Sequence, residues 1–121
     1  MTTNAKGPLA GIKVLDVTAN LAGPAASMHL ADLGADVIKV EKPVLGDDTR
    51  RFGEEYKGES SSFMMINRNK RGLAIDLKHE DGKAIFRRLV RDVDVLVENF
   101  LKDTMNRLGL GYEALREINP G

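Results

Sequence analysis

The apolar residues of this chain fall into short runs, and amphipathic segments separate them. Residues 12–17 (IKVLDV) and 36–41 (DVIKVE) have the composition of buried strands. The stretch between them, 21–34 (LAGPAASMHLADLG), indicates a helix that stops at Gly34. A strand, a helix and a second strand within about 30 residues predict a right-handed βαβ unit with parallel strands. We expect the apolar stripe of this helix to consist of Ala26, Leu30 and Leu33.

The second half of the chain continues the alternation of helices and strands. Residues 80–91 (EDGKAIFRRLVR) predict an amphipathic helix, with acids in the first turn and arginines in the last as the helix dipole favours. Residues 94–100 (DVLVENF) predict a strand, and short helices follow over about 102–108 and 112–118. The whole pattern is typical of an α/β fold with a mostly parallel sheet and flanking helices.

The middle of the chain is less regular. Residues 42–62 are polar, contain several glycines and show no sustained period, so we expect a long surface excursion. The apolar stretches 62–67 (SFMMIN) and 73–76 (LAID) then bracket a basic turn, RNKRG, at 68–72. Loops of this length within a compact domain are usually functional or disordered.

Composition excludes several classes of function. The chain has 121 residues, which suits a single domain over residues 1–121, and its 18 basic and 18 acidic residues cancel. This balance gives no reason to expect nucleic acid or a membrane as partner. There is no cysteine, and the two histidines, His29 and His79, are too far apart in sequence to indicate a local metal site. No apolar run approaches the roughly 20 residues of a membrane span, and the first residues lack the apolar core of a secretory signal, so we expect a cytoplasmic protein without a metal.

Candidate binding residues stand where the predicted strands end. TANLAGP (18–24) follows the first strand, Lys42 follows the second, and Asn99 and Phe100 end the last. Ligands of open α/β sheets bind beyond the carboxyl ends of the strands, so these positions should converge, with Arg50 and Arg51 near by. An amide, an aromatic ring and several cations suit a nucleotide-like ligand. Taken singly, Asn99 is also a plausible turn residue and Phe100 a plausible core residue.

Motifs for catalysis are weak. GLGYEA (109–114) matches a dinucleotide pattern by its letters, but it follows a predicted helix, so Gly109 is better interpreted as a helix stop. Three serines at 60–62 have no histidine at an interpretable spacing. Asp16 and Asp76 fall within strand runs, and we expect both to be buried and paired. Residue types alone therefore predict no catalytic constellation.

Several motifs together resemble one family. LAGP, LGADVIKVE, GDDTR, NRNKR, DVLVENF and LGLGYEAL, spread between Pro8 and Pro120, are similar to the N-terminal part of the class III coenzyme A transferases. That group includes formyl-, carnitine- and bile-acid-related CoA transferases and the α-methylacyl-CoA racemases. The resemblance implies a Rossmann-like, CoA-binding N-terminal region of an interlocked, ring-like homodimer that acts on an acyl-CoA and a carboxylic acid.

The resemblance also implies a set of CoA contacts. The positions that match the contacts of the family are Leu21, Ala22, Lys42, Ile75, Asp76, Leu77, Lys78, Asn99, Phe100, Leu101 and Arg107. Among these, Lys42 and Arg107 would be available to the phosphates of CoA. The chain departs from other members at Ala19 and Leu21, where some transferases carry polar side chains, and at Lys42, where others carry arginine. A lysine offers a point charge in place of a bidentate fork.

No residue of this sequence matches the catalytic aspartate of the family, which acts as a covalent nucleophile. The resemblance therefore implies that the chain is truncated before the catalytic region and is inactive by itself as a CoA transferase. Two alternatives stay open from the sequence: a fragment of an α-methylacyl-CoA racemase or epimerase, and a CoA-binding remnant without catalysis.

Overall fold

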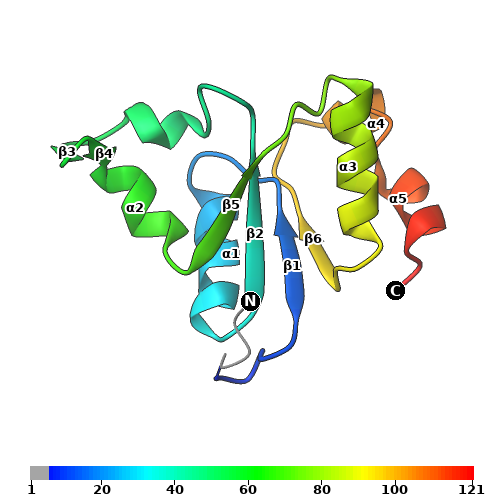
Figure 1. Ribbon diagram of the computed structural model, residues 1–121, viewed down its shortest axis with the longest axis horizontal. Coiled ribbons are helices and arrows are strands. Elements are labelled where there is room, and N and C mark those ends of the chain that lie inside the picture. The colour runs from blue at the N-terminus through cyan, green and yellow to red at the C-terminus, as the bar shows by residue number, and fades with distance from the viewer. Residues whose placement is uncertain (1–5) are drawn as a thin grey trace.

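The computed structural model describes residues 6–121 and confirms the α/β class, with a parallel four-stranded sheet between helices (Figure 1). The sheet has the order β5-β2-β1-β6 and consists of β1 (Lys13–Asp16), β2 (Asp36–Glu41), β5 (Lys70–Ala74) and β6 (Val95–Val97). The helices are α1 (Ala22–Asp32), α2 (Ser61–Asn67), α3 (Glu80–Val90), α4 (Thr104–Arg107) and α5 (Tyr112–Ile118). The predicted strands and helices of both halves are thus present, although β6 is shorter than residues 94–100.

The connections explain the two layers of helices. The crossover from β1 to β2 passes through α1 on one face, and the crossover from β5 to β6 passes through α3 on the other (Figure 1). The two crossovers run in opposite directions across the sheet and use opposite faces, which gives both of them the same hand. All four strands therefore point the same way, and their carboxyl ends meet at one edge of the sheet.

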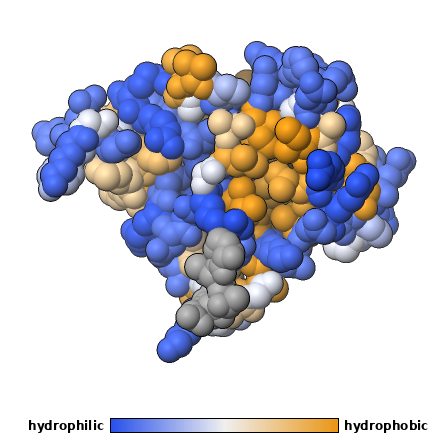
Figure 2. All heavy atoms as spheres, in the orientation of Figure 1, coloured by the Kyte–Doolittle hydropathy of each residue, from blue (hydrophilic) through white to orange (hydrophobic). Residues whose placement is uncertain are grey.

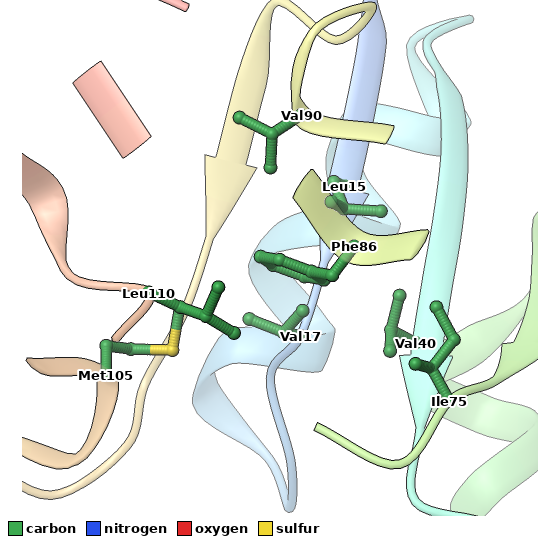
Figure 3. Packing of buried hydrophobic residues seen from close by; sticks show 8 residues of the cluster. All are labelled: Leu15, Val17, Val40, Ile75, Phe86, Val90, Met105 and Leu110. Carbon is green, nitrogen blue, oxygen red and sulfur yellow. The ribbon is translucent and has the colours of Figure 1, made fainter. Parts of the chain in front are cut away.

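The larger core lies between the sheet and α3. Phe86 is fully buried and packs among Leu15, Val17 and Val90 (Figure 3). Leu110, which lies between α4 and α5 in the chain, belongs to the same cluster and is also fully buried. A smaller core on the α1 face comprises Val14, Ala31, Ala35 and Val37. On the α3 face the helix does not cover the whole sheet, and Figure 2 shows a continuous apolar area there. Leu73 of β5 and Ile85 of α3 are 36% and 46% exposed.

Residues 42–62 form the expected surface excursion, in which most residues are exposed, but the excursion has secondary structure of its own. This segment contains a 3₁₀ helix, η1 (Asp48–Arg51), and a small hairpin of β3 (Glu55–Tyr56) and β4 (Glu59–Ser60). The buried Ser60 hydroxyl donates to the carbonyl oxygen of Thr49 at 2.7 Å and so ties the hairpin to η1. Individual polar hydrogen bonds hold the segment in place, and they leave no period in the sequence.

The basic turn expected at 68–72 is shorter than predicted: Arg68 and Asn69 form it, and β5 begins at Lys70. Arginines on either side of Lys70 pair with acids at the two ends of the connection between α1 and β2. Arg68 contacts Asp32 at 2.7 Å, and Arg71 contacts Asp36 at 2.7 Å. The arginines of this segment therefore hold β5 against the βαβ unit.

The buried face of α1 also differs from the predicted stripe. Ala26 and Leu33 are exposed, and the helix instead turns Ser27, Met28 and Ala31 toward the sheet. Ser27 is buried because its hydroxyl donates to Asp16 at 2.6 Å. A polar contact, rather than the apolar stripe, therefore sets the rotation of this helix.

Asp16 is buried and paired as predicted. Its Oδ2 accepts hydrogen bonds from Ser27 and from the Lys70 ammonium, the latter at 2.9 Å, and its Oδ1 accepts from the backbone and hydroxyl of Thr18. The Lys70 ammonium also donates to the Pro24 carbonyl and the Asn67 amide oxygen, both at 2.8 Å. The matching expectation for Asp76 was wrong: Asp76 lies beyond the end of β5 and is exposed.

Replacement of Lys70 by methionine should destabilise the fold strongly. The Lys70→Met variant leaves the Asp16 carboxylate buried without its cation, which costs about 3–5 kcal/mol in the free energy of unfolding. The exposed pair Arg71–Asp36 provides the control, because Arg71→Met should cost less than about 1 kcal/mol. Urea denaturation of both variants measures the difference, and equal small losses would contradict this account of the core.

Stability should also fall in acid. Burial raises the pKa of Asp16, but hydrogen bonds from Ser27, Thr18 and Lys70 outweigh it and hold the pKa below the ordinary value of 3.8. The unfolded chain therefore takes up the proton first, so the contribution of Asp16 is complete above roughly pH 5 and is lost as the pH falls through the folded pKa. Urea denaturation between pH 7 and pH 3 should show this loss, and a flat profile would speak against it.

Candidate functional site

A cleft of about 420 Å³ opens at the carboxyl edge of the sheet. Residues at or beyond the ends of all four strands line it, and α4 closes one side. Its apolar walls include Val17, Val40, Leu77 and Phe100, while charged residues such as Lys42 stand among the lining. The predicted convergence of the strand ends is therefore confirmed.

Asn99 joins the ends of β1 and β6. Its amide oxygen accepts from the backbone N–H of Ala19 at 3.0 Å, and its amide nitrogen donates to the Ala19 carbonyl at 2.9 Å. This two-point contact fixes Ala19, which lines the cleft, and orients the neighbouring Phe100 toward it. The run ENF thus ends a strand, as a turn residue would, and also shapes the mouth of the cleft.

Two glycines let helices approach the strand ends closely. A Cβ on Gly23 would lie 2.3 Å from the Cβ of Thr18, and a Cβ on Gly82 would lie 1.9 Å from the carbonyl oxygen of Asp76. Gly23 therefore allows α1 to begin directly against the turn that follows β1, and Gly82 allows α3 to pack against the segment after β5. Both segments contribute walls to the cleft.

Three of the cations around the cleft are paired with acids. Lys42 contacts Asp48 at 3.0 Å, and Arg51 contacts the same carboxylate oxygen at 2.6 Å. Arg50 forms a two-point pair with Glu41, with both N–O distances at 2.7 Å, and stacks 3.6 Å over the ring of Phe63. Exposed pairs of this kind contribute little stability, so an anionic ligand can exchange with the carboxylate of Asp48 at modest cost.

Glu41 is bound more firmly than Asp48. Burial raises the pKa of Glu41, but the hydrogen bonds from Arg50 and from the backbone of Asp47 outweigh it and lower the pKa below its usual value. The carboxylate is thus held in its charged form by the loop that follows β2. Arg50, which we expected near a ligand, is engaged in this contact.

The predicted CoA-contact residues divide into two groups. Six of them line the cleft: Lys42, Ile75, Asp76, Leu77, Lys78 and Phe100. The other five lie around it. Leu21 and Ala22 stand at the start of α1, and Arg107 stands at the end of α4. Asn99 is hydrogen-bonded to the backbone of Ala19, and the side chain of Leu101 is 85% exposed. Arg107 reaches the cleft indirectly, because it donates to the hydroxyl of the lining residue Thr104 at 3.2 Å. Their roles toward a ligand stay predictions.

Sequence reasoning missed several lining residues. Asp47 and Asp48 belong to the walls, as do Thr104 and Leu108 of the α4 region, whereas Thr18 lies in the predicted segment 18–24. One available signal was a lysine, Lys39, in the middle of a predicted buried strand, since a buried lysine requires an acid from elsewhere in the chain.

The composition of the cleft lining indicates what kind of molecule it suits. Within residues 6–121, no cluster of three or more His, Asp or Glu side chains is arranged to hold a metal ion. Over the same residues, no helix combines the length and apolar character that a membrane span needs. Apolar walls with exchangeable cations at the rim suit an amphiphilic, anionic molecule.

Comparisons with known proteins agree with this geometry. The family model described as CoA-transferase family III matches residues 9–121. The chain is 48% identical over 114 residues to human succinyl-CoA:glutarate CoA-transferase and 50% identical over 124 residues to succinate–glutarate CoA-transferase of Agrobacterium fabrum. These matches cover 93% and 97% of this chain but only 26% and 31% of the relatives. The chain thus spans about a quarter to a third of the length of these curated relatives.

Solved structures give the same result. A CAIB/BAIF family protein from Brucella suis superposes with a TM-score of 0.87 at 44% identity, over 93% of this chain and 31% of that one. A Mycobacterium tuberculosis protein superposes with a TM-score of 0.88 at 43% identity, over 97% and 32%. With a family model over almost its whole length and relatives near half identical, the chain belongs to CoA-transferase family III.

Proposed function

We propose that this chain binds coenzyme A or an acyl-CoA in the strand-end cleft, as the CoA-binding region of an enzyme that transfers CoA from an acyl-CoA to a carboxylic acid. The observation that carries the proposal is the cleft itself, which six of the predicted CoA-contact residues line. The relatives add support, since their names describe CoA transfers that involve glutarate or, in Escherichia coli, oxalate.

The chemistry of the cleft fits the parts of CoA. CoA combines apolar and aromatic portions with several phosphates, and the cleft combines apolar walls with a cationic rim. In the proposed arrangement, Phe100 and Leu77 contact the apolar portions, and Lys42 gives up Asp48 to bind a phosphate. Arg107 stands close enough to Thr104 to contribute a second cation. Asn99 acts mainly by holding Ala19, because its amide already contacts that backbone.

The carboxylates around the cleft are engaged, so none of them is offered as a nucleophile. Asp48 binds Lys42, Asp47 binds Lys39, and Asp76 accepts from the backbone N–H of Lys78. Glu41 is held by Arg50. We therefore propose that residues 6–121 bind the thioester substrate and that the transfer itself needs a carboxylate that they do not supply.

We further propose a homodimer, as the family resemblance implies, in the cytoplasm, as expected from the sequence. The continuous apolar area on the α3 face (Figure 2) supports further burial. A second subunit, or more of the polypeptide, would cover this area in the assembled enzyme.

Calorimetric titration with CoA tests the site. The folded protein should bind CoA saturably, and Phe100→Ala and Arg107→Ala should each weaken binding by roughly 1–3 kcal/mol through loss of a ring contact and of a charge-assisted hydrogen bond. Arg116→Ala is the matched control, because Arg116 is an exposed arginine on α5 and lies outside this cleft. Binding that survives both cleft substitutions unchanged would place CoA elsewhere, and a folded protein that ignores CoA would overturn the proposal.

An activity assay tests the division between binding and transfer. The 121-residue chain, incubated with succinyl-CoA and glutarate, should form no glutaryl-CoA above the buffer rate, because its carboxylates near the cleft are engaged. Chromatography of the thioesters measures the product. Turnover that responds to protein concentration would show that a nucleophile lies within these residues.

A further inference from the structure

Lys39 is a lysine at the centre of the sheet. It occupies the middle of β2, between β1 and β5, and is 2% exposed. Its ammonium donates to the carbonyl oxygen of Thr18 at 3.0 Å and lies 2.9 Å from the Oδ2 of Asp47. A charge in this position is tolerated only because an acid from the loop after β2 folds back to meet it.

Asp47 connects this lysine to two separate segments. Its Oδ1 accepts from the backbone N–H of Asn20 at 3.2 Å, in the turn after β1. The same oxygen accepts from the backbone N–H of Thr49 at 3.0 Å and from its hydroxyl at 2.9 Å, in η1. One buried carboxylate therefore holds the turn after β1, the loop after β2 and the centre of the sheet.

The two segments held by Asp47 form facing walls of the cleft. Thr18 and Ala19 contribute one wall, and Lys42, Gly46 and Asp48 contribute the other. The turn after β1 contains Asn20 with a φ of 68°, a left-handed conformation that needs support from its surroundings. The hydrogen bond from Asn20 to Asp47 is the contact that joins the turn after β1 to the loop after β2.

We propose that the buried Lys39–Asp47 pair is a positioning device that sets the separation of the two cleft walls for the ligand. The inference rests on the proposed CoA site. Lys39 acts through Asp47 and Thr18, because it does not line the cleft itself. A buried ion pair contributes little net stability relative to apolar side chains of similar volume, so the geometry it imposes is its main effect.

The double variant Lys39→Met/Asp47→Asn separates positioning from stability. It removes both buried charges together, so no unpaired ion remains, and it breaks the links from Lys39 to the side chain at position 47 and to the Thr18 carbonyl, which join both segments to the centre of the sheet. The free energy of unfolding should stay close to that of the native protein. CoA affinity should nevertheless fall at least tenfold, and backbone amides in residues 17–22 and 43–52 should exchange with solvent faster.

Arg71→Met is the control, since Arg71 also forms an ion pair with a residue of β2, and neither Arg71 nor Asp36 lines the cleft. Its CoA affinity should stay within twofold of the native value, and amides in residues 17–22 and 43–52 should exchange at the native rate. If the pair were only structural, the double variant would keep the native CoA affinity, and that result would overturn the proposal.

Amide exchange decides the inference even if CoA does not bind. Native-like exchange of residues 17–22 and 43–52 in the double variant would overturn the positioning role in any case. Faster exchange of both segments together would support it, and a native protein that fails to bind CoA would then count against the proposed function alone.

Discussion

Four ionisable side chains, Asp16, Lys39, Asp47 and Lys70, are buried on the α1 side of the sheet, and the arrangement of the chain depends on them. Each has a side chain no more than 2% exposed. The loss of hydration costs several kcal/mol for each ion, so two acids and two lysines are tolerable only when opposite charges approach within hydrogen-bonding distance. Asp16 and Lys39 are register partners on β1 and β2, whereas Asp47 and Lys70 come from later segments. The chain must bring these later segments back to the sheet.

This constraint specifies connections as well as contacts. Lys70 draws β5 toward β1 and α1, and Asp47 draws the loop after β2 toward the turn after β1. A slip of one residue in either strand pairing would turn these charges toward the apolar face packed by α3. The buried charges therefore favour one register and one path for the middle of the chain, in which periodicity is weakest.

The cleft follows from the same arrangement. Parallel strands place their carboxyl ends at one edge, and the buried pairs fix the segments that leave that edge. The interior of the cleft is apolar, while Lys42 at its rim is paired with the exposed carboxylate of Asp48. The relatives of this chain are named for CoA transfers with different acids, glutarate and oxalate among them.

The local sequence pattern was enough to predict the alternation of strands and helices, the parallel sheet and the edge at which Lys42 and Phe100 meet. Hydrophobic periodicity and strand-end position are local properties, so these predictions needed no knowledge of distant contacts. The sequence predicted that Asp16 and Asp76 are both buried, and the structure was needed to show that β5 ends before Asp76 and leaves it exposed, because burial of an acid depends on whether a lysine from another segment meets it. For the same reason Ser27, rather than the apolar Leu33, faces the sheet, and the loop holding Asp47 is ordered: long-range pairing of buried charge leaves no periodic trace in a sequence.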